Sequence, residues 1–375
     1  MKLLVLRPTP RSLDYACFSD DRREPLIAAS LRDYRGSVAD RTSLLHALQE
    51  IQTACAPVMG QLQPDGIAIA TRFGGEAFDS PTLLNAEAMK QLKSLIPQAP
   101  MDLPGLLELI HASRLVFPDI PKVMLFETSF FTRLPLRERM YGLERELART
   151  LHVRRYGYHG LFHEAACSLA ASTRAATGRH SPARVLSICL EPHPEVSAVI
   201  GQSPVTVSSG ATPLEGIPGH TSCGELDPGT ILILAKEQKW GPEQINRLLT
   251  QQSGLLGLTG RAMTVEEVLL SDAPELALAR SILQYRILQS CGAGMAAMGG
   301  FDTMVFSGRF AEAGEHLGPW LLDRLSFRGG ELTEKPHSMI CHESINRVSA
   351  DQAVPTLLDA LRNESVPSAS FHRPA

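Results

Sequence analysis

Two strand–turn–strand segments, about half a chain apart, constrain the fold of this sequence most strongly. Residues 3–18 read LLVLRPTPRSLDYACF, and residues 188–201 read ICLEPHPEVSAVIG. In each segment a proline-containing turn separates two apolar runs, which is the pattern of a β-hairpin. Because the second segment echoes the first, we expect two halves of similar fold, each opening with a hairpin.

The rest of the chain alternates between strand and helix patterns. Its 375 residues are enough for two domains of ordinary size. Further β-rich runs lie at 67–71, 123–126, 205–209, 303–308 and 338–341, and stretches with helical spacing lie at 41–62, 136–151, 160–176 and 275–298. This alternation predicts an α/β protein. We place the domain boundary near residue 150, which gives domains of 1–150 and 151–350.

Composition and charge argue against several classes of protein. The net charge is −4 and Lys and Arg are scattered, which gives no electrostatic footprint for nucleic acid. No run approaches the roughly 18 apolar residues of a membrane span, and the amino-terminal apolar run is too short for a signal peptide. We therefore expect a cytoplasmic protein without nucleic-acid or membrane partners. The seven cysteines form no C-x-x-C pair and are expected to be reduced and buried.

Several ungapped strings resemble the signature blocks of acetate kinases, which belong to the actin-like ATPase superfamily. They are RRYGYHGLFH (154–163), ATPLEGIPGHTSCGELDPGTI (211–231), QSGLLGLTG (252–260) and GAGMAAMGGFDTMVFSG (292–308). FGGEAF (73–78), APMDLPGL (99–106) and LFETSFFTRLP (125–135) fit the same family more loosely. The resemblance covers roughly residues 1–350, and the combination of blocks is far more specific than any one of them.

The resemblance implies a fold and an activity. The fold would consist of two actin-like (ribonuclease H-like) domains with a cleft between them, the first completed by a helix at 351–363. The activity would be phosphoryl transfer between ATP and a short-chain carboxylate with magnesium, in a homodimer formed through the second domain. Such chemistry depends on positioning and charge neutralisation, and therefore on cationic side chains and phosphate-binding amides.

The two hairpin turns depart from the family pattern. By the resemblance they hold the nucleotide phosphates, and the first turn corresponds to Arg7 through Ser12, where Pro8 and Pro10 have no N–H to donate. The family's glycine-rich second turn corresponds to Cys189, Glu191, Pro192, His193 and Pro194. Glu191 and Glu195 are expected to repel a polyphosphate. We predict that this turn no longer binds phosphate.

The reacting centre departs as well. Two family arginines align with Ala70 and Ser222, and each such arginine contributes about 10³ to 10⁵ in rate. The family's catalytic aspartate aligns with Glu127 and a family histidine with Asp102, while His159 is retained. By the same resemblance the substrate pocket comprises Arg72, Met101, Tyr158 and Pro213, the adenine-side motif becomes SGRFAEAG (307–314), and Glu343 corresponds to a magnesium ligand. Arg72 and Ala70 are expected on one face of a strand.

These substitutions lead to a preferred hypothesis and two alternatives. The chain is predicted to be a degenerate acetate-kinase-like protein, a pseudoenzyme with little or no kinase activity that is retained for binding a small anion or carboxylate, or for regulation. The first alternative is an active carboxylate kinase with a rebuilt site that uses Arg72, His159 and Glu127. The second is a protein that forms heterodimers with a true acetate kinase.

Three local patterns have a plainer interpretation beside the functional one. His159 and His163 are four residues apart and could bind a metal, but a hydrogen-bonded structural role is favoured. Glu191, His193 and Glu195 alternate and could attract a cation, but an ordinary solvated turn is favoured. Arg7 and Arg11 could bind an anion, with a solvated turn again as the default.

Overall fold

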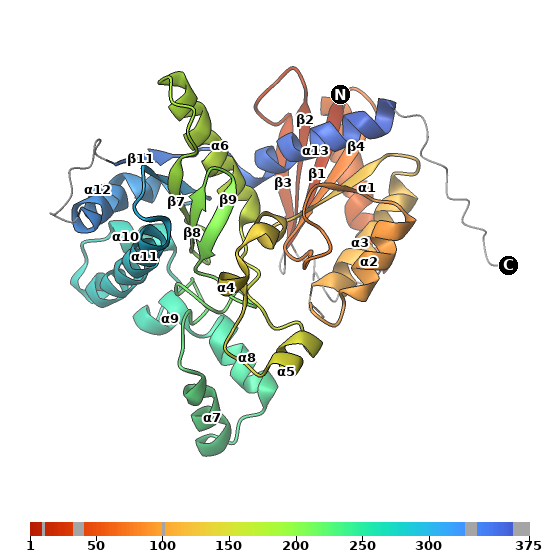
Figure 1. Cartoon of the computed structure of the whole chain (residues 1–375). Helices are drawn as coiled ribbons and strands as arrows, with labels where there is room; N and C mark the ends of the chain where they lie inside the picture. Colours follow the sequence, from red (N-terminus) through yellow and green to blue (C-terminus); the bar gives the residue numbers. More distant parts are fainter. Residues whose placement is uncertain (10–11, 33–40, 100–101, 327–335, 363–375) are drawn as a thin grey trace. The chain divides into compact units, whose positions relative to one another are not determined.

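The computed structural model describes the chain except residues 10–11, 33–40, 100–101, 327–335 and 363–375 (Figure 1). The chain divides into two compact units. The first comprises Met1–Thr132 together with the chain from Ser344 onward, and the second comprises Arg133–Glu343. The division between the units falls at Thr132, upstream of the position near residue 150 expected from the sequence. The last described helix, α13 (Ile345–Arg362), lies in the first unit.

The first unit contains a mixed sheet with the strand order β3-β2-β1-β4-β6-β5. Its strands are β1 (Lys2–Pro8), β2 (Ser12–Ser19), β3 (Ile27–Arg32), β4 (Gly66–Thr71), β5 (Thr82–Leu83) and β6 (Lys122–Phe126). β1, β2 and β3 form an antiparallel meander, and β4 and β6 continue the sheet parallel to β1. The predicted hairpin is present, with Arg7 opposite Asp14.

The second unit repeats this arrangement in the order β11-β10-β7-β8-β9. Its strands are β7 (Arg184–Cys189), β8 (Glu195–Ile200), β9 (Ser203–Val207), β10 (Thr303–Ser307) and β11 (His337–Ile340). β7, β8 and β9 form the meander, and β10 and β11 run parallel to β7. Apart from the additional edge strand β5, the two described sheets therefore share one topology, which confirms the internal repeat expected from the two hairpins.

Helices cover the faces of both sheets (Figure 1). In the first unit α13 packs on β1, β4 and β6, while α1 (Arg41–Met59) packs on α3 (Leu103–Val116) and α2 (Ala86–Ser94) also contacts α3. In the second unit α6 (Gly160–Ala176) packs on β7 and β10, and α11 (Ala277–Met298) packs on β8 and β9. The remaining helices of that unit are α4 (Leu136–Arg139), α5 (Arg145–Thr150), α7 (Pro228–Glu237), α8 (Pro242–Gln251), α9 (Gly254–Thr259), α10 (Val265–Leu270) and α12 (Gly314–Leu325).

One predicted helix and two strands differ from the sequence-based expectation. Residues 136–151 form two short helices, α4 and α5, because Met140 adopts extended backbone angles between them. The side chain of Glu144 accepts hydrogen bonds from the amides of Glu146 and Leu147, and so begins a second helix. Strands β3 and β5 were not predicted, since neither carries a long apolar run.

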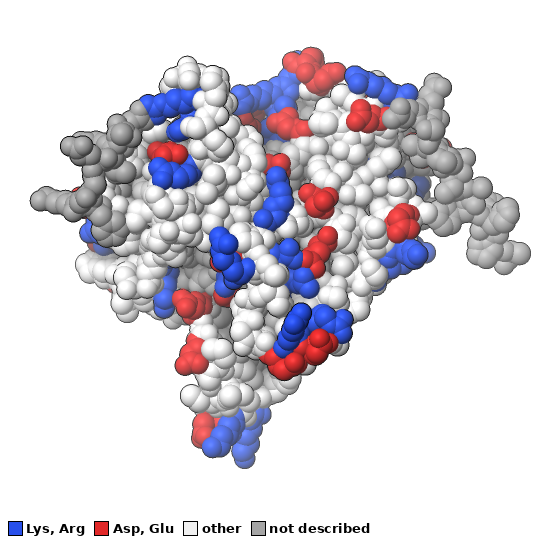
Figure 2. All heavy atoms as spheres, in the orientation of Figure 1, with Lys and Arg blue, Asp and Glu red and all other residues white. Residues whose placement is uncertain are grey.

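Surface charge and helix hydrophobicity relate to the expected absence of nucleic-acid and membrane partners. On the face shown in Figure 2, Lys and Arg lie interspersed with Asp and Glu. Among the described residues, none of the helices combines the length and apolar character that crossing a membrane requires.

A buried lysine gives a pH-dependent stability. Lys122 begins β6, and its Nζ donates to Phe117 O at 2.8 Å and Ile120 O at 2.9 Å. Burial lowers the pKa of Lys122 to about 8, with the charge of Arg114 acting in the same direction. Between pH 8 and the ordinary lysine range the unfolded chain binds this proton and the folded chain does not, so the unfolding free energy rises with pH in that window.

We expect this rise to reach about 3 kcal/mol at most, because each pKa unit corresponds to about 1.4 kcal/mol. Urea unfolding of the wild-type chain and of Lys122→Met at pH 7.5 and pH 10 measures this rise. The contributions of other titrating groups are the same in both proteins, so they cancel when the variant's change in unfolding free energy is subtracted from that of the wild type. The wild-type chain should gain stability relative to the variant as the pH increases. An identical pH dependence in both proteins would show that Lys122 keeps an ordinary pKa.

Candidate functional site

Charged side chains gather at the carboxyl ends of three neighbouring parallel strands in the first unit. Arg7 lies near the end of β1, Arg72 directly follows β4, and Glu127 directly follows β6. The amide of Glu127 donates to Thr71 O at 2.9 Å, which continues the pairing of β4 with β6. Ligands of α/β sheets bind at the carboxyl ends of the strands, so this edge is the candidate site of the first unit.

Arg7 neutralises Glu127. Arg7 Nη2 lies 3.6 Å from Glu127 Oε1, and only 11% of the Arg7 side chain is exposed. The expectation of a solvated Arg7 is therefore wrong, because the strand aims its side chain at a buried carboxylate. Arg11 lies outside the described residues. Arg72 is exposed in the bend after Thr71, where β4 ends, so it does not share a strand face with the buried Ala70 as expected.

Asp102 adds a carboxyl group to this edge. It is the residue before α3, and its side chain makes no capping hydrogen bond. Desolvation raises the pKa of Asp102, the charge of Arg72 opposes this, and the charge of Glu127 adds to it. The carboxyl group therefore holds its proton to a higher pH than an ordinary aspartate does.

The second hairpin turn holds an internal ion pair. Arg309, which follows β10, donates its backbone N–H to Glu191 Oε1 at 2.8 Å, and its Nη2 lies 3.0 Å from Oε2. Glu191 is only 3% exposed. The prediction of a solvated turn is therefore wrong for Glu191, and so is the expectation that its charge stands free to repel phosphate. The Arg309 guanidinium and amide compensate that charge.

Glu195 lies in a second buried network. It begins β8, is 0% exposed, and accepts the Tyr158 N–H at 2.9 Å through Oε2. His163, on α6, places Nε2 3.0 Å from Glu195 Oε1 and Nδ1 2.7 Å from Ser187 Oγ. The solvated-turn prediction is also wrong for Glu195, whereas the structural role favoured for His163 is confirmed. The network ties the start of α6 to the sheet.

His159 lies at the start of α6, against the second turn. Its backbone is left-handed, with φ 51°, and its Nε2 lies 3.0 Å from His193 O. His193 Nδ1 lies in turn 2.7 Å from Ser222 Oγ. The structure thus brings the retained histidine together with two substituted family positions. Sequence reasoning did not find the contact between His193 and Ser222, which are 29 residues apart.

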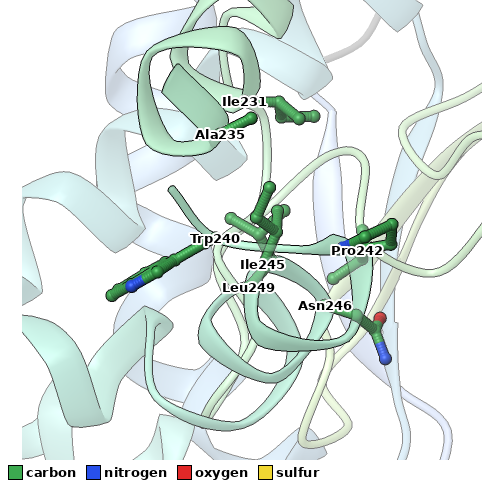
Figure 3. Close-up of a pocket in the computed structure, with 8 residues that line it drawn as sticks. Ile231, Ala235, Trp240, Pro242, Ile245, Asn246 and Leu249 are labelled. Atoms are coloured by element: carbon green, nitrogen blue, oxygen red, sulfur yellow. The ribbon is translucent and has the colours of Figure 1, made fainter. Parts of the chain in front are cut away.

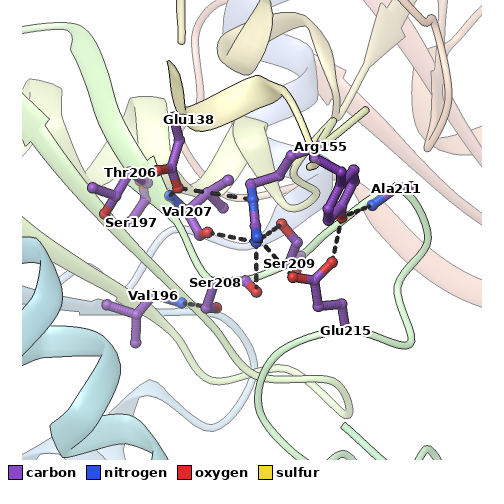
Figure 4. Close-up of polar contacts among 11 residues, drawn as sticks. Glu138, Arg155, Val196, Ser197, Thr206, Val207, Ser208, Ser209, Ala211 and Glu215 are labelled. Atoms are coloured by element: carbon purple, nitrogen blue, oxygen red, sulfur yellow. Dashed lines mark hydrogen bonds and ion pairs between the residues drawn. The ribbon is translucent and has the colours of Figure 1, made fainter. Parts of the chain in front are cut away.

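An arginine organises the segment that leads to Pro213 (Figure 4). Arg155 Nη1 donates to the carbonyl oxygens of Val207, Ser208 and Ser209, and its Nη2 lies 2.7 Å from Glu215 Oε1. The sequence did not reveal this role. Because the arginine caps consecutive carbonyls after β9, it fixes where the 207–215 segment runs.

Two tyrosines also bond to the same segment. Tyr141 OH donates to Glu215 and accepts the Ala211 N–H at 2.9 Å, and burial raises the pKa of Tyr141. Tyr158 OH donates to Ala211 O at 3.0 Å. Tyr158, an expected pocket position, is thus bonded to the segment that contains Pro213, another such position. Met101, the third apolar position, lies outside the described residues.

Comparisons with known proteins settle the family. The model of the acetokinase family matches residues 30–364. The chain belongs to this family. It is 31% identical over 309 residues to the acetate kinase of Clavibacter michiganensis subsp. michiganensis. The aligned region covers 82% of this chain and 78% of the relative.

Solved structures show the acetokinase fold. The acetate kinase of Porphyromonas gingivalis matches with a TM-score of 0.80 at 22% identity, covering 95% of this chain and 99% of that one. A propionate kinase from Francisella tularensis matches with a TM-score of 0.79 at 21% identity, covering 94% and 98%. The predicted family and its two-domain α/β fold are confirmed.

The other positions mapped from the acetokinase pattern lie in the second unit. Cys189 is buried at the end of β7, and Pro192 follows Glu191 in the turn. Glu343 is half-buried and follows β11 in the chain. Among the described residues no group of three or more His, Cys, Asp or Glu could hold a metal ion. A magnesium ion at Glu343 would therefore depend on other oxygen ligands, such as those of a nucleotide.

An apolar groove between α7 and α8 is a separate feature of the second unit (Figure 3). It is lined by Leu214, Ile231, Ala235, Trp240, Pro242, Ile245, Asn246 and Leu249. None of these side chains is charged, so the groove does not resemble an anion site. The exposed Leu232 and Ile233 extend the apolar surface of α7 beside it.

Proposed function

We propose that this acetokinase family member binds a small carboxylate or related anion and has little or no kinase activity, so that its role is binding or regulation. The observation that carries the proposal is the internal ion pair at the second hairpin turn. The carboxylate of Glu191 takes both the amide and the guanidinium group of Arg309. Phosphate groups bind to such donors, and in this chain the protein itself uses them.

The backbone of the turn supports the same proposal. Pro192 and Pro194 have no N–H groups, and the amide of Leu190 donates to Ser307 O at 2.7 Å. Few donors therefore remain for a nucleotide at this turn. The residues present do not fit a bound polyphosphate, although the family resemblance implies ATP and magnesium.

The first unit supports binding of a small anion. Arg72 presents an exposed guanidinium group at the carboxyl edge of its sheet, and Asp102 has a raised pKa beside it. The guanidinium group suits a carboxylate ligand, which accepts its hydrogen bonds.

An active carboxylate kinase with a rebuilt site is the second candidate function. One observation favours it: the first unit keeps two guanidinium groups, Arg7 and Arg72, at the edge where Glu127 lies. These groups can supply positive charge in place of the arginines that the resemblance maps to Ala70 and Ser222. In that case Glu127 and His159 would keep catalytic roles.

Trapping acyl phosphate separates the two functions. The purified chain is incubated with ATP, magnesium and acetate, propionate or butyrate, and hydroxylamine converts acyl phosphate to a coloured hydroxamate. We expect a rate at least about 10³-fold below that of an active acetate kinase assayed in parallel, because two transition-state arginines are missing. Turnover that Arg72→Ala abolishes would establish the active kinase instead.

Assembly through the second unit remains part of the proposal. The exposed apolar surface of α7 is compatible with a homodimer. Light scattering on the purified chain measures its mass, and a monomer would count against this part. Co-purification with an active acetate kinase would favour the heterodimer instead.

A further inference from the structure

The contact between Glu191 and Arg309 joins two loops at the carboxyl ends of neighbouring parallel strands. Glu191 follows β7, and Arg309 follows β10. The backbones hold these loops close, since the Leu190 N–H donates to Ser307 O at 2.7 Å and the Phe310 N–H donates to Leu190 O at 3.0 Å. The two charged side chains therefore meet on a fixed frame.

Arg309 presents the donors of an oxyanion site. Its backbone N–H lies 2.8 Å from Glu191 Oε1, its Nε lies 3.2 and 3.1 Å from the two carboxylate oxygens, and its Nη2 lies 3.0 Å from Oε2. A main-chain amide beside a guanidinium fork binds phosphate as well as carboxylate. Gly308 allows the turn, with φ 90°, because a Cβ there would lie 2.7 Å from Leu190 O.

The neighbouring histidine adds no charge to these donors. The His220 ring lies 5.5 Å from the Phe310 ring, and its Nε2 accepts the Val265 N–H at 3.0 Å. Burial lowers the pKa of His220, and the charge of Arg309 lowers it further. Arg309 is therefore the side chain that draws an anion to this turn.

The two partners differ in their access to water. Glu191 is 3% exposed, whereas 51% of the Arg309 side chain is exposed. An anion from solvent can reach the guanidinium group, but it must displace a carboxylate that the backbone tethers beside it. A tethered group competes at an effective concentration on the order of millimolar or more.

We propose that Arg309 forms a binding site for phosphate-type oxyanions, which Glu191 occupies as an internal ligand. The inference rests on the proposed function in one respect, since both treat the second hairpin turn as closed to free phosphate groups. It adds the reason why the turn is closed: the donors of Arg309 are still present, but the Glu191 carboxylate occupies them. Removal of that carboxylate opens the site.

Isothermal titration with inorganic phosphate at low ionic strength tests this inference. We expect Glu191→Ala to bind phosphate at least tenfold more tightly than the wild-type chain. The double variant with Arg309→Ala should lose that gain. Glu191→Gln keeps an acceptor for the Arg309 amide and removes the negative charge, so it should fold and show an intermediate gain. Circular dichroism establishes which variants are folded.

Glu225→Ala is the matched control in the same unit. Glu225 pairs with Arg286 at 3.0 Å through side chains alone, so its removal frees a guanidinium group without an amide beside it. We expect no gain in phosphate binding there. Equal phosphate affinity in the wild-type chain and Glu191→Gln, or no binding by any folded Glu191 variant, would overturn the inference. Failure of the proposed function appears separately, as acyl phosphate formed by the wild-type chain.

Discussion

Replacing Glu195 with alanine is expected to lower the unfolding free energy by about 2–6 kcal/mol, because two buried polar groups lose their acceptor at about 1–3 kcal/mol each. Glu195 is 0% exposed and accepts from both the Tyr158 amide and His163 Nε2. Alanine would leave these two polar groups in a dry interior without their acceptor. The loss should also loosen the start of α6, where His159 lies.

Urea unfolding of the variant measures this loss. Glu195→Gln keeps an amide oxygen for the Tyr158 N–H, so it should cost less than alanine. The control is Glu225→Ala, whose pair with Arg286 is largely exposed, at 67% and 38% of the two side chains. We expect that change to stay within about 0.5 kcal/mol. If Glu195→Ala costs no more than Glu225→Ala, the buried network does not tie the start of α6 to the sheet.

Features that depend on local sequence could be predicted. Apolar runs bounded by turn residues located both hairpins and their parallel neighbours, because a buried strand needs such a run whatever lies around it. The break in the 136–151 helix also had a local signal, since Gly142 precedes Glu144, which caps α5. Helical spacing alone did not reveal it.

The roles of the charged turn residues could not be predicted, because their partners come from distant segments. The charge of Glu191 is compensated by Arg309, 118 residues away, and Glu195 is hydrogen-bonded to His163, 32 residues away. A polar turn looks solvated until the elements packed against it are known. The same holds for Arg7, whose partner Glu127 follows a different strand. The family resemblance predicted that these residues lie near the site, but it did not predict which residues they contact.

Loss of nucleotide binding is the second large expected effect. Binding of ATP requires several phosphate contacts at once. The second turn contains two prolines without N–H groups, and the neighbouring Arg309 amide is already taken by Glu191. Without these contacts we expect a dissociation constant for ATP and magnesium weaker than about 1 mM, which corresponds to about 4 kcal/mol of binding free energy. Glu191→Gln should strengthen the interaction, since it frees Arg309.

Isothermal titration of the wild-type chain with ATP in the presence of magnesium tests the central claim most directly. The account predicts no saturable heat up to millimolar nucleotide. One molecule of ATP bound per chain with a micromolar dissociation constant would contradict it.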